Sequence, residues 1–257
     1  MQVIPVLDLL DGHVVRAVRG ERTAYRPIRS PLAAAGEPLH IARALLAASG
    51  ARTLYIADLG AILQQCPHVD TLAALRASLP GIEIWLDAGF TDYRSMQALF
   101  ARIDASGKID GKRDGKRDAL ARPATLVPVF GSETLRDAGA LQAADTAGLS
   151  PILSLDHRAG QLLTAGARSD TFDAAHLSWP RRVIAMTLDQ VGSYDGPDLA
   201  TFERIRADAP PYTDVIGAGG IRHRDDLAAA AQTGASAWLV ASALHDGRLG
   251  MPLAAST

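Results

Sequence analysis

The sequence predicts a single (β/α)8 barrel, an α/β fold, from its length, its alternation of strand and helix patterns, and an internal repeat. A chain of 257 residues is in the size range of one such barrel. Short apolar, β-branched runs alternate with longer segments of helical spacing, which is typical of a parallel sheet covered by helices. Hydrophobic residues make up 48% of the chain, which is enough for one large core.

Each predicted strand is a short, nearly continuous apolar run. In chain order these runs are residues 3–9, 53–58, 82–87, 125–130, 152–156, 182–187, 214–217 and 237–240. Helices are expected at residues 40–48, 70–78, 93–103, 134–146, 199–208 and 225–232. An open, doubly wound sheet would show the same alternation. The internal repeat favours the barrel.

The repeat appears when the two halves of the chain are compared. Ile-Pro-Val-Leu-Asp at residues 4–8 matches Ile-Leu-Ser-Leu-Asp at residues 152–156. The ends of the third and seventh strands match, and so do the ends of the fourth and eighth. These matched ends are residues 87–90 with 218–221, and residues 130–132 with 240–242. Three matches in the same order predict a barrel built from two half-barrels.

One polar segment interrupts this single domain of residues 1–257. Residues 104–120 are predicted to form a mobile loop insertion, because Asp-Gly-Lys-Arg occurs twice there, at 110–113 and 114–117, without apolar periodicity. The interleaved aspartates and the absence of aromatic residues argue against binding of nucleic acid by this loop.

The composition excludes several classes of function. A formal net charge of −2 gives no electrostatic footprint for nucleic acid or for an anionic membrane. One cysteine allows no intramolecular disulfide, and neither a signal peptide nor a membrane span is evident, so a cytoplasmic protein is expected. The histidines lack the spacing of a metal site, and no dinucleotide fingerprint or P-loop occurs. The oligomeric state is left open.

Two aspartates are the candidate catalytic residues. Asp8 ends the first predicted strand and Asp156 ends the fifth, which lie opposite each other in an eight-stranded ring. Active sites of such barrels form at the C-terminal ends of the strands. Two carboxyl groups facing across this mouth can act as a general acid and a general base. The alternative is that each aspartate only caps the loop that follows it.

Small residues at other strand ends predict phosphate binding. Gly219 and Gly220 follow the seventh strand and Ser242 follows the eighth, which are the two loops where barrels most often hold a phosphate. Glycines let backbone N–H groups approach the anion.

A second phosphate site is predicted by the same logic at Gly89, Gly131 and Ser132, although Asp87 would repel an anion there. Further substrate contacts are expected from Arg16, Arg19 and Asp195, which could equally be ordinary loop residues.

Residues 3–16 (Val-Ile-Pro-Val-Leu-Asp-Leu-Leu-Asp-Gly-His-Val-Val-Arg) resemble the opening of the histidine-biosynthesis isomerase family, phosphoribosylformimino-5-aminoimidazole carboxamide ribotide isomerase. The resemblance continues through residues 155–156, 219–221 and 242–244. It implies a cofactor-free Amadori rearrangement, an aldose–ketose isomerisation, of an aminoaldose with two phosphates. Asp8 and Asp156 would be its acid–base pair. The two phosphates would lie at the two predicted sites.

The chain departs from the family pattern after the third strand. Asp-Ala-Gly-Phe-Thr at residues 87–91 replaces a three-glycine turn followed by Val-Arg, which argues against the second phosphate. Residues 22–28 and 55–59 are closer to an isomerase-like branch from organisms with methanopterin-linked one-carbon metabolism. A glutaminase-coupled cyclase of the same family would have a lysine where residues 16–19 read Arg-Ala-Val-Arg. The alternatives are a diverged paralogue in a one-carbon cofactor pathway and a non-catalytic phosphometabolite-binding barrel.

Overall fold

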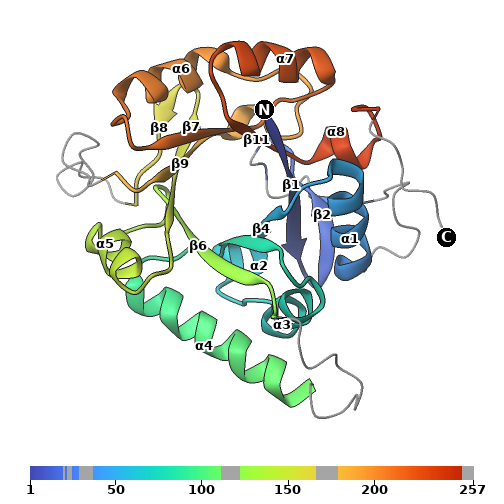
Figure 1. Ribbon diagram of the computed structural model, residues 1–257, viewed down its shortest axis with the longest axis vertical. Helices are drawn as coiled ribbons and strands as arrows, with labels where there is room; N and C mark the ends of the chain where they lie inside the picture. Colours follow the sequence, from blue (N-terminus) through green and yellow to red (C-terminus); the bar gives the residue numbers. More distant parts are fainter. Residues whose placement is uncertain (20, 22–24, 29–36, 111–121, 166–178, 251–257) are drawn as a thin grey trace.

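The computed structural model describes residues 1–19, 21, 25–28, 37–110, 122–165 and 179–250, and its parallel strands close into an eight-stranded barrel (Figure 1). In order around the barrel they are β1 (Gln2–Leu10), β4 (Thr53–Asp58), β5 (Glu83–Asp87), β6 (Thr125–Gly131), β7 (Ile152–Arg158), β9 (Arg182–Thr187), β10 (Asp214–Ala218) and β11 (Ala237–Val240). The barrel closes because β11 pairs with β1, from Gln2 opposite Ala237 to Pro5 opposite Val240. The predicted barrel is therefore confirmed, and the open sheet is excluded.

Helices cover the outside of the barrel (Figure 1). The longer ones are α1 (Pro38–Ser49), α3 (Val69–Ser78), α4 (Tyr93–Asp110), α5 (Gly139–Thr146), α6 (Leu199–Asp208) and α7 (Arg224–Gln232). Three short helices follow the carboxyl ends of strands: α2 (Leu59–Gln64), the 3-10 helix η2 (Leu188–Gln190) and α8 (Ser242–His245). None of the helices in the described part of the chain has the length and hydropathy of a membrane span.

Two predicted helix boundaries were wrong. The helix expected at residues 93–103 continues to Asp110, so the first part of the predicted insertion, residues 104–110, is helical. The helix expected from residue 134 begins only at Gly139, because the backbone N–H groups of Arg136 and Asp137 donate to the Thr91 carbonyl (2.9 and 3.2 Å). Residues 111–121 and 22–24, which carried other sequence-based expectations, lie outside the described residues.

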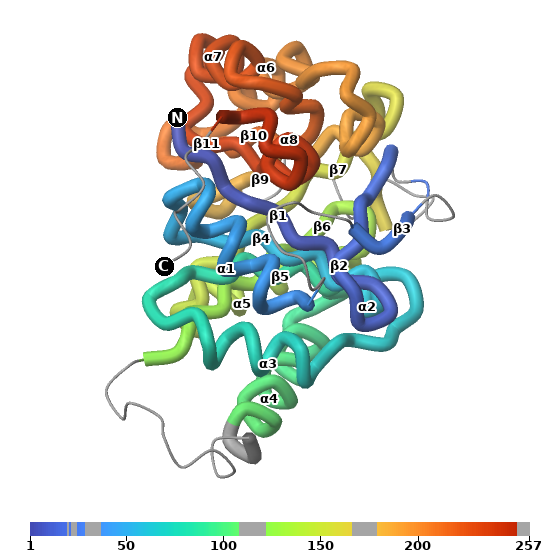
Figure 2. Tube along the Cα trace, turned by 90° about the vertical axis from the view of Figure 1, so that its right-hand side faces the viewer, coloured from blue at the N-terminus to red at the C-terminus, as the bar shows by residue number. Residues whose placement is uncertain are grey.

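Short antiparallel hairpins extend β1 and β7 beyond the two candidate aspartates. β2 (His13–Arg16) pairs with β1, and β3 (Arg26–Pro27) pairs with β2; β8 (Gln161–Leu162) pairs with β7. Both turns have two consecutive residues with positive φ, at positions 11–12 and 159–160, as in a type I′ turn. A side view places β2, β3 and α2 at the end of the barrel opposite the N-terminus (Figure 2). The matched hairpins agree with a half-barrel repeat, which stays a prediction.

The barrel interior is filled with apolar side chains at its N-terminal end. Inward-facing side chains such as Ile4, Val127, Ile152 and Ile216 form a buried cluster inside the ring. Below them, the Glu83 carboxylate accepts hydrogen bonds from the Trp85 indole and the Arg182 guanidinium, both at 2.5 Å. This packing leaves the C-terminal mouth as the place for a site.

The contact of Gly217 with Trp238 yields a stability prediction. A Cβ added at Gly217 would lie 2.2 Å from the Trp238 ring, which is 1% exposed and packs against Phe202 at 5.3 Å between ring centroids. Gly217→Ala is therefore expected to destabilise the fold by about 1–3 kcal/mol through overpacking. Thermal and urea unfolding measure this. The control is Gly107→Ala in α4, where the added Cβ meets no atom within 4 Å. It should be neutral or gain up to about 1 kcal/mol from helix propensity.

Candidate active site

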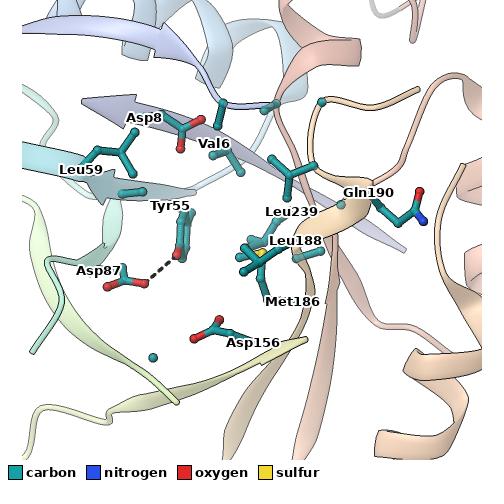
Figure 3. Close-up of a pocket in the computed structure, with 18 of the residues that line it drawn as sticks. Val6, Asp8, Tyr55, Leu59, Asp87, Asp156, Met186, Leu188, Gln190 and Leu239 are labelled. Carbon is teal, nitrogen blue, oxygen red and sulfur yellow. Dashed lines mark hydrogen bonds between the residues drawn. The ribbon is translucent and has the colours of Figure 1, made fainter. Parts of the chain in front are cut away.

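A large pocket, shown in Figure 3, opens at the C-terminal ends of the strands. Every barrel strand contributes a residue to it. It encloses about 1230 Å³, open space at its mouth included. The strands contribute Val6, Asp8, Tyr55, Ala57, Asp87, Gly131, Asp156, Arg158, Met186, Ala218, Leu239 and Val240.

Asp8 points into this pocket from β1 (Figure 3). Its side chain is largely buried, and the residue pairs with Ala57 of β4 on one side and Val15 of β2 on the other. Burial raises the pKa of the Asp8 carboxyl from 3.8 to about 7, against the opposing effect of a hydrogen bond from the Ala17 backbone. A carboxyl group with a pKa near neutrality can both give and take a proton.

Asp156 faces the same pocket from β7, as the repeat in the sequence predicted. The Ser154 hydroxyl donates to its Oδ1 at 2.7 Å, and the Glu133 backbone N–H donates to its Oδ2 at 3.2 Å. Burial is the largest cause that raises the pKa of Asp156 to about 7, and the neighbouring Asp87 adds to it. The two candidate catalytic residues therefore share one cavity and one pKa range.

Asp87 and Tyr55 complete the polar wall of the pocket. The Tyr55 hydroxyl donates to Asp87 Oδ2 at 3.1 Å, and the Gly89 backbone N–H donates to Oδ1 at 3.0 Å. Figure 3 shows the Tyr55 ring among the carboxyl groups of Asp8, Asp87 and Asp156. Burial raises the pKa of Asp87 to about 6; burial and the three aspartates raise the pKa of Tyr55 well above 10. Sequence reasoning placed Asp87 beside the predicted second phosphate site only as a group that repels an anion. It missed Tyr55, although inward placement on a strand was a signal for it.

The first predicted phosphate site is assembled on the side of the mouth opposite Asp87. Gly219, Gly220 and Ser242 all line the pocket. No hydrogen bond within the described part of the chain has the backbone N–H of any of these three residues as its donor. The loop is held from behind, because the Trp238 indole N–H donates to the Gly219 carbonyl at 3.0 Å. Gly220 also has a packing role, since a Cβ there would lie 2.2 Å from the Gly196 carbonyl oxygen.

The second predicted phosphate site is not assembled in the same way. Gly131 lines the pocket, whereas Gly89 and Ser132 do not. The buried Ser132 hydroxyl accepts the Asp156 backbone N–H at 2.9 Å, so it braces a strand end. A Cβ at Gly131 would lie 2.9 Å from Asp156 Oδ2 and 3.8 Å from Asp87 Oδ2. Carboxyl groups therefore border the place where a phosphate was predicted.

The other predicted substrate contacts do not line the pocket. Arg16, Arg19 and Asp195 instead form contacts at its mouth. Arg16 donates to both carboxylate oxygens of Asp246 (2.5 and 3.1 Å) and to the Tyr194 hydroxyl at 2.7 Å. Arg19 forms an exposed ion pair with Asp195 at 2.7 Å. These contacts join the end of β2 to the loop after β9 and to Asp246 after α8. Tyr194 of the loop after β9 does line the pocket.

The hydrogen bond from Ser154 to Asp156 can be tested directly. Ser154 donates to the ionised carboxylate and so lowers its pKa. Ser154→Ala should therefore raise the pKa of Asp156 further, by about one unit for a hydrogen bond to a charged group. Titration followed by carboxyl-carbon NMR measures the shift. Ser236→Ala, at an exposed serine that contacts Asp214, is the control and should leave the Asp156 titration in place.

Comparison with known proteins adds independent information. A profile of the family described as "Histidine biosynthesis protein" matches residues 2–109 and 117–250. An uncharacterised protein of Methanocaldococcus jannaschii is 26% identical over 251 residues, which cover 97% of this chain and 95% of that protein. The 1-(5-phosphoribosyl)-5-((5-phosphoribosylamino)methylideneamino)imidazole-4-carboxamide isomerase of Thermomicrobium roseum is 27% identical, with coverage of 97% and 94%. The imidazole glycerol phosphate synthase subunit HisF of Leifsonia xyli is 29% identical, with coverage of 97% and 91%.

Proposed function

Since the chain belongs to the histidine biosynthesis protein family, we propose that it is an isomerase-type enzyme acting on a small phosphorylated, sugar-like substrate. The chemistry is a cofactor-free aldose–ketose isomerisation. One observation carries the proposal: Asp8 and Asp156, from β1 and β7, point into one pocket with pKa values near 7. Groups that titrate near the working pH are the effective general acids and bases.

The two carboxyl groups suit the two proton transfers of an Amadori rearrangement. The protonated aspartate gives its proton to the ring oxygen of the aminoaldose, the C1–O bond breaks, and the nitrogen lone pair forms a C=N bond. The ionised aspartate then removes the proton from C2, and the C2 electrons form an enamine. Loss of the C2 hydroxyl proton and protonation of C1 give the ketose. One carboxyl loses a proton while the other gains one, so the pair as a whole is regenerated.

Gly219, Gly220 and Ser242 are proposed to hold the substrate phosphate. Their backbone N–H groups have no hydrogen-bond acceptor among the described residues, and they lie on the pocket surface. Backbone N–H groups in glycine loops are suitable donors to phosphate oxygens. The phosphate would anchor one end of the substrate and leave its reacting carbons between the two aspartates.

The position of Asp87 favours a substrate other than the bisphosphate of the histidine pathway. A second phosphate near Gly131 would meet the carboxyl groups of Asp87 and Asp156. Like charges in a partly dehydrated site repel strongly. A diverged paralogue in a one-carbon cofactor pathway, with a different phosphorylated substrate, therefore fits better than the histidine-pathway isomerase.

The deciding experiment is an assay of the purified protein with the histidine-pathway aminoaldose and with aldose monophosphates in deuterium oxide. Ketose formation, or deuterium at C2 of the sugar, supports the isomerase; rescue of a histidine auxotroph would identify the aminoaldose as substrate. Binding of a sugar phosphate without exchange at C2, with Asp8→Asn leaving that binding unchanged, would contradict catalysis and support a binding protein.

A further inference from the structure

The pocket has two chemically different ends. Its charged lining residues in the described part of the chain are the acidic residues Asp8, Asp87, Glu133 and Asp156 and the basic residue Arg158. Arg158 is exposed, whereas Asp8 and Asp156 are buried and Asp87 is half-buried. Gly219 and Gly220 after β10 and Ser242 at the start of α8 contribute neutral N–H donors. A substrate that bridges the pocket therefore meets N–H groups at one end and carboxyl oxygens at the other.

Asp87 is rigidly held and retains hydrogen-bonding capacity. Tyr55 fixes Oδ2 and the Gly89 backbone N–H fixes Oδ1. A carboxylate can accept about four hydrogen bonds, so capacity for roughly two more remains. Gly131 has no side chain to fill the space next to Asp87, since a Cβ there would stand 3.8 Å from Oδ2. The free capacity of Asp87 is therefore next to open pocket space.

The ionised form of the Asp87 carboxyl is disfavoured in this pocket. Burial raises its pKa from 3.8 to about 6. No Lys or Arg of the described residues forms a salt bridge with Asp87. A buried carboxylate without a cationic partner is costly, and a ligand with a positive charge would offset that cost.

Resting on the isomerase proposed above, we infer that Asp87, positioned by Tyr55, determines substrate specificity. It accepts hydrogen bonds from an amino group at the end of the substrate remote from its single phosphate, and it rejects a second phosphate there. The substrate class is thus an aminated sugar monophosphate. A metal ion is a weaker candidate for this end, because the described carboxyl groups are not arranged as a set of three metal ligands.

Two matched pairs of ligands test the inference by calorimetry at pH 7.5. Glucosamine 6-phosphate and glucose 6-phosphate differ by an ammonium group in place of a hydroxyl group. Fructose 1,6-bisphosphate and fructose 6-phosphate differ by a second phosphate. The unmodified protein is expected to bind glucosamine 6-phosphate about tenfold more tightly than glucose 6-phosphate. It is also expected to bind fructose 6-phosphate about tenfold more tightly than fructose 1,6-bisphosphate. Asp87→Asn should abolish both preferences, and Tyr55→Phe should weaken both.

The control variant is Asp225→Asn, at an exposed aspartate of α7 outside the pocket, which should keep both preferences. Equal affinities within each pair in the unmodified protein, or preferences that persist in Asp87→Asn, would overturn the inference. If no sugar phosphate binds, the phosphate end of the proposed function is wrong and the inference falls with it. If both preferences are found but no aldose is isomerised, the proposed reaction is wrong while the selectivity of Asp87 stands.

Discussion

Asp8→Asn or Asp156→Asn is expected to lower turnover of the phosphorylated aldose by about 10²–10⁴-fold, the usual contribution of a general acid or base. An asparagine amide has nearly the shape of the carboxyl group, but it cannot give or take the proton. Both side chains line the same pocket, so each loss should appear mainly in kcat, with substrate affinity changed much less. Steady-state kinetics together with calorimetric binding separates the two effects.

The controls for this prediction address folding and position. Asp225→Asn changes the same side chain on an exposed face of α7 and should keep full turnover. Unfolding curves of the Asp8 and Asp156 variants should show no loss of stability, since each change removes a buried carboxyl group. Turnover within a factor of about three of the unmodified protein in either pocket variant would exclude that aspartate from the acid–base pair.

The placement of Asp8 and Asp156 at one mouth and the strand order were predictable because both depend on local sequence. An apolar run that ends in a carboxylate marks a strand end, and strand ends meet at one mouth of a parallel barrel. The full length of α4 was not predictable in this way. Residues 104–110 lack apolar periodicity, and contacts with α3 stabilise them as a helix: Arg76 pairs with Asp104, and the Ser106 hydroxyl donates to Asp70 at 2.7 Å.

The polar wall of the pocket depends on register, which the sequence does not show. Tyr55 reaches Asp87 because β4 and β5 align with Ala57 opposite Asp87, which places the tyrosine two residues away on the same face. Arg16 pairs with Asp246, 230 residues later in the chain, only because the barrel closes. Arg16 was expected to contact the substrate because it follows the first strand. Its partner Asp246 could not be identified from the sequence, so its contacts at the mouth of the pocket were not predicted.

The stability of the fold is expected to fall as the pH rises from about 4 to about 7. Burial raises the pKa values of Asp8 and Asp156 from 3.8 to about 7 and that of Asp87 to about 6. The folded state therefore binds these protons more tightly than the unfolded state. Their favourable contribution is complete below pH 3.8 and is lost as the pH passes the folded-state values. Asp226, whose pKa Arg222 lowers, acts oppositely in stronger acid. His245 also acts oppositely, because burial lowers its pKa from 6.5 to about 4. The upward pKa shifts of the three pocket aspartates together exceed the downward shift of His245 and decide the direction.

A shift of about three units corresponds to about 4 kcal/mol for each of Asp8 and Asp156, at roughly 1.4 kcal/mol per unit. Urea unfolding at pH 4.5 and pH 8 measures the effect as a lower midpoint at pH 8. Asp8→Asn and Asp156→Asn should each raise the midpoint at pH 8 and change it little at pH 4.5, whereas Asp225→Asn should follow the unmodified protein.

A protein more stable at pH 8, with both pocket variants unchanged, would show that these carboxyl groups are not desolvated. The same burial would then no longer explain their suitability for proton transfer, so this measurement tests the physical basis of the proposed chemistry without requiring the substrate.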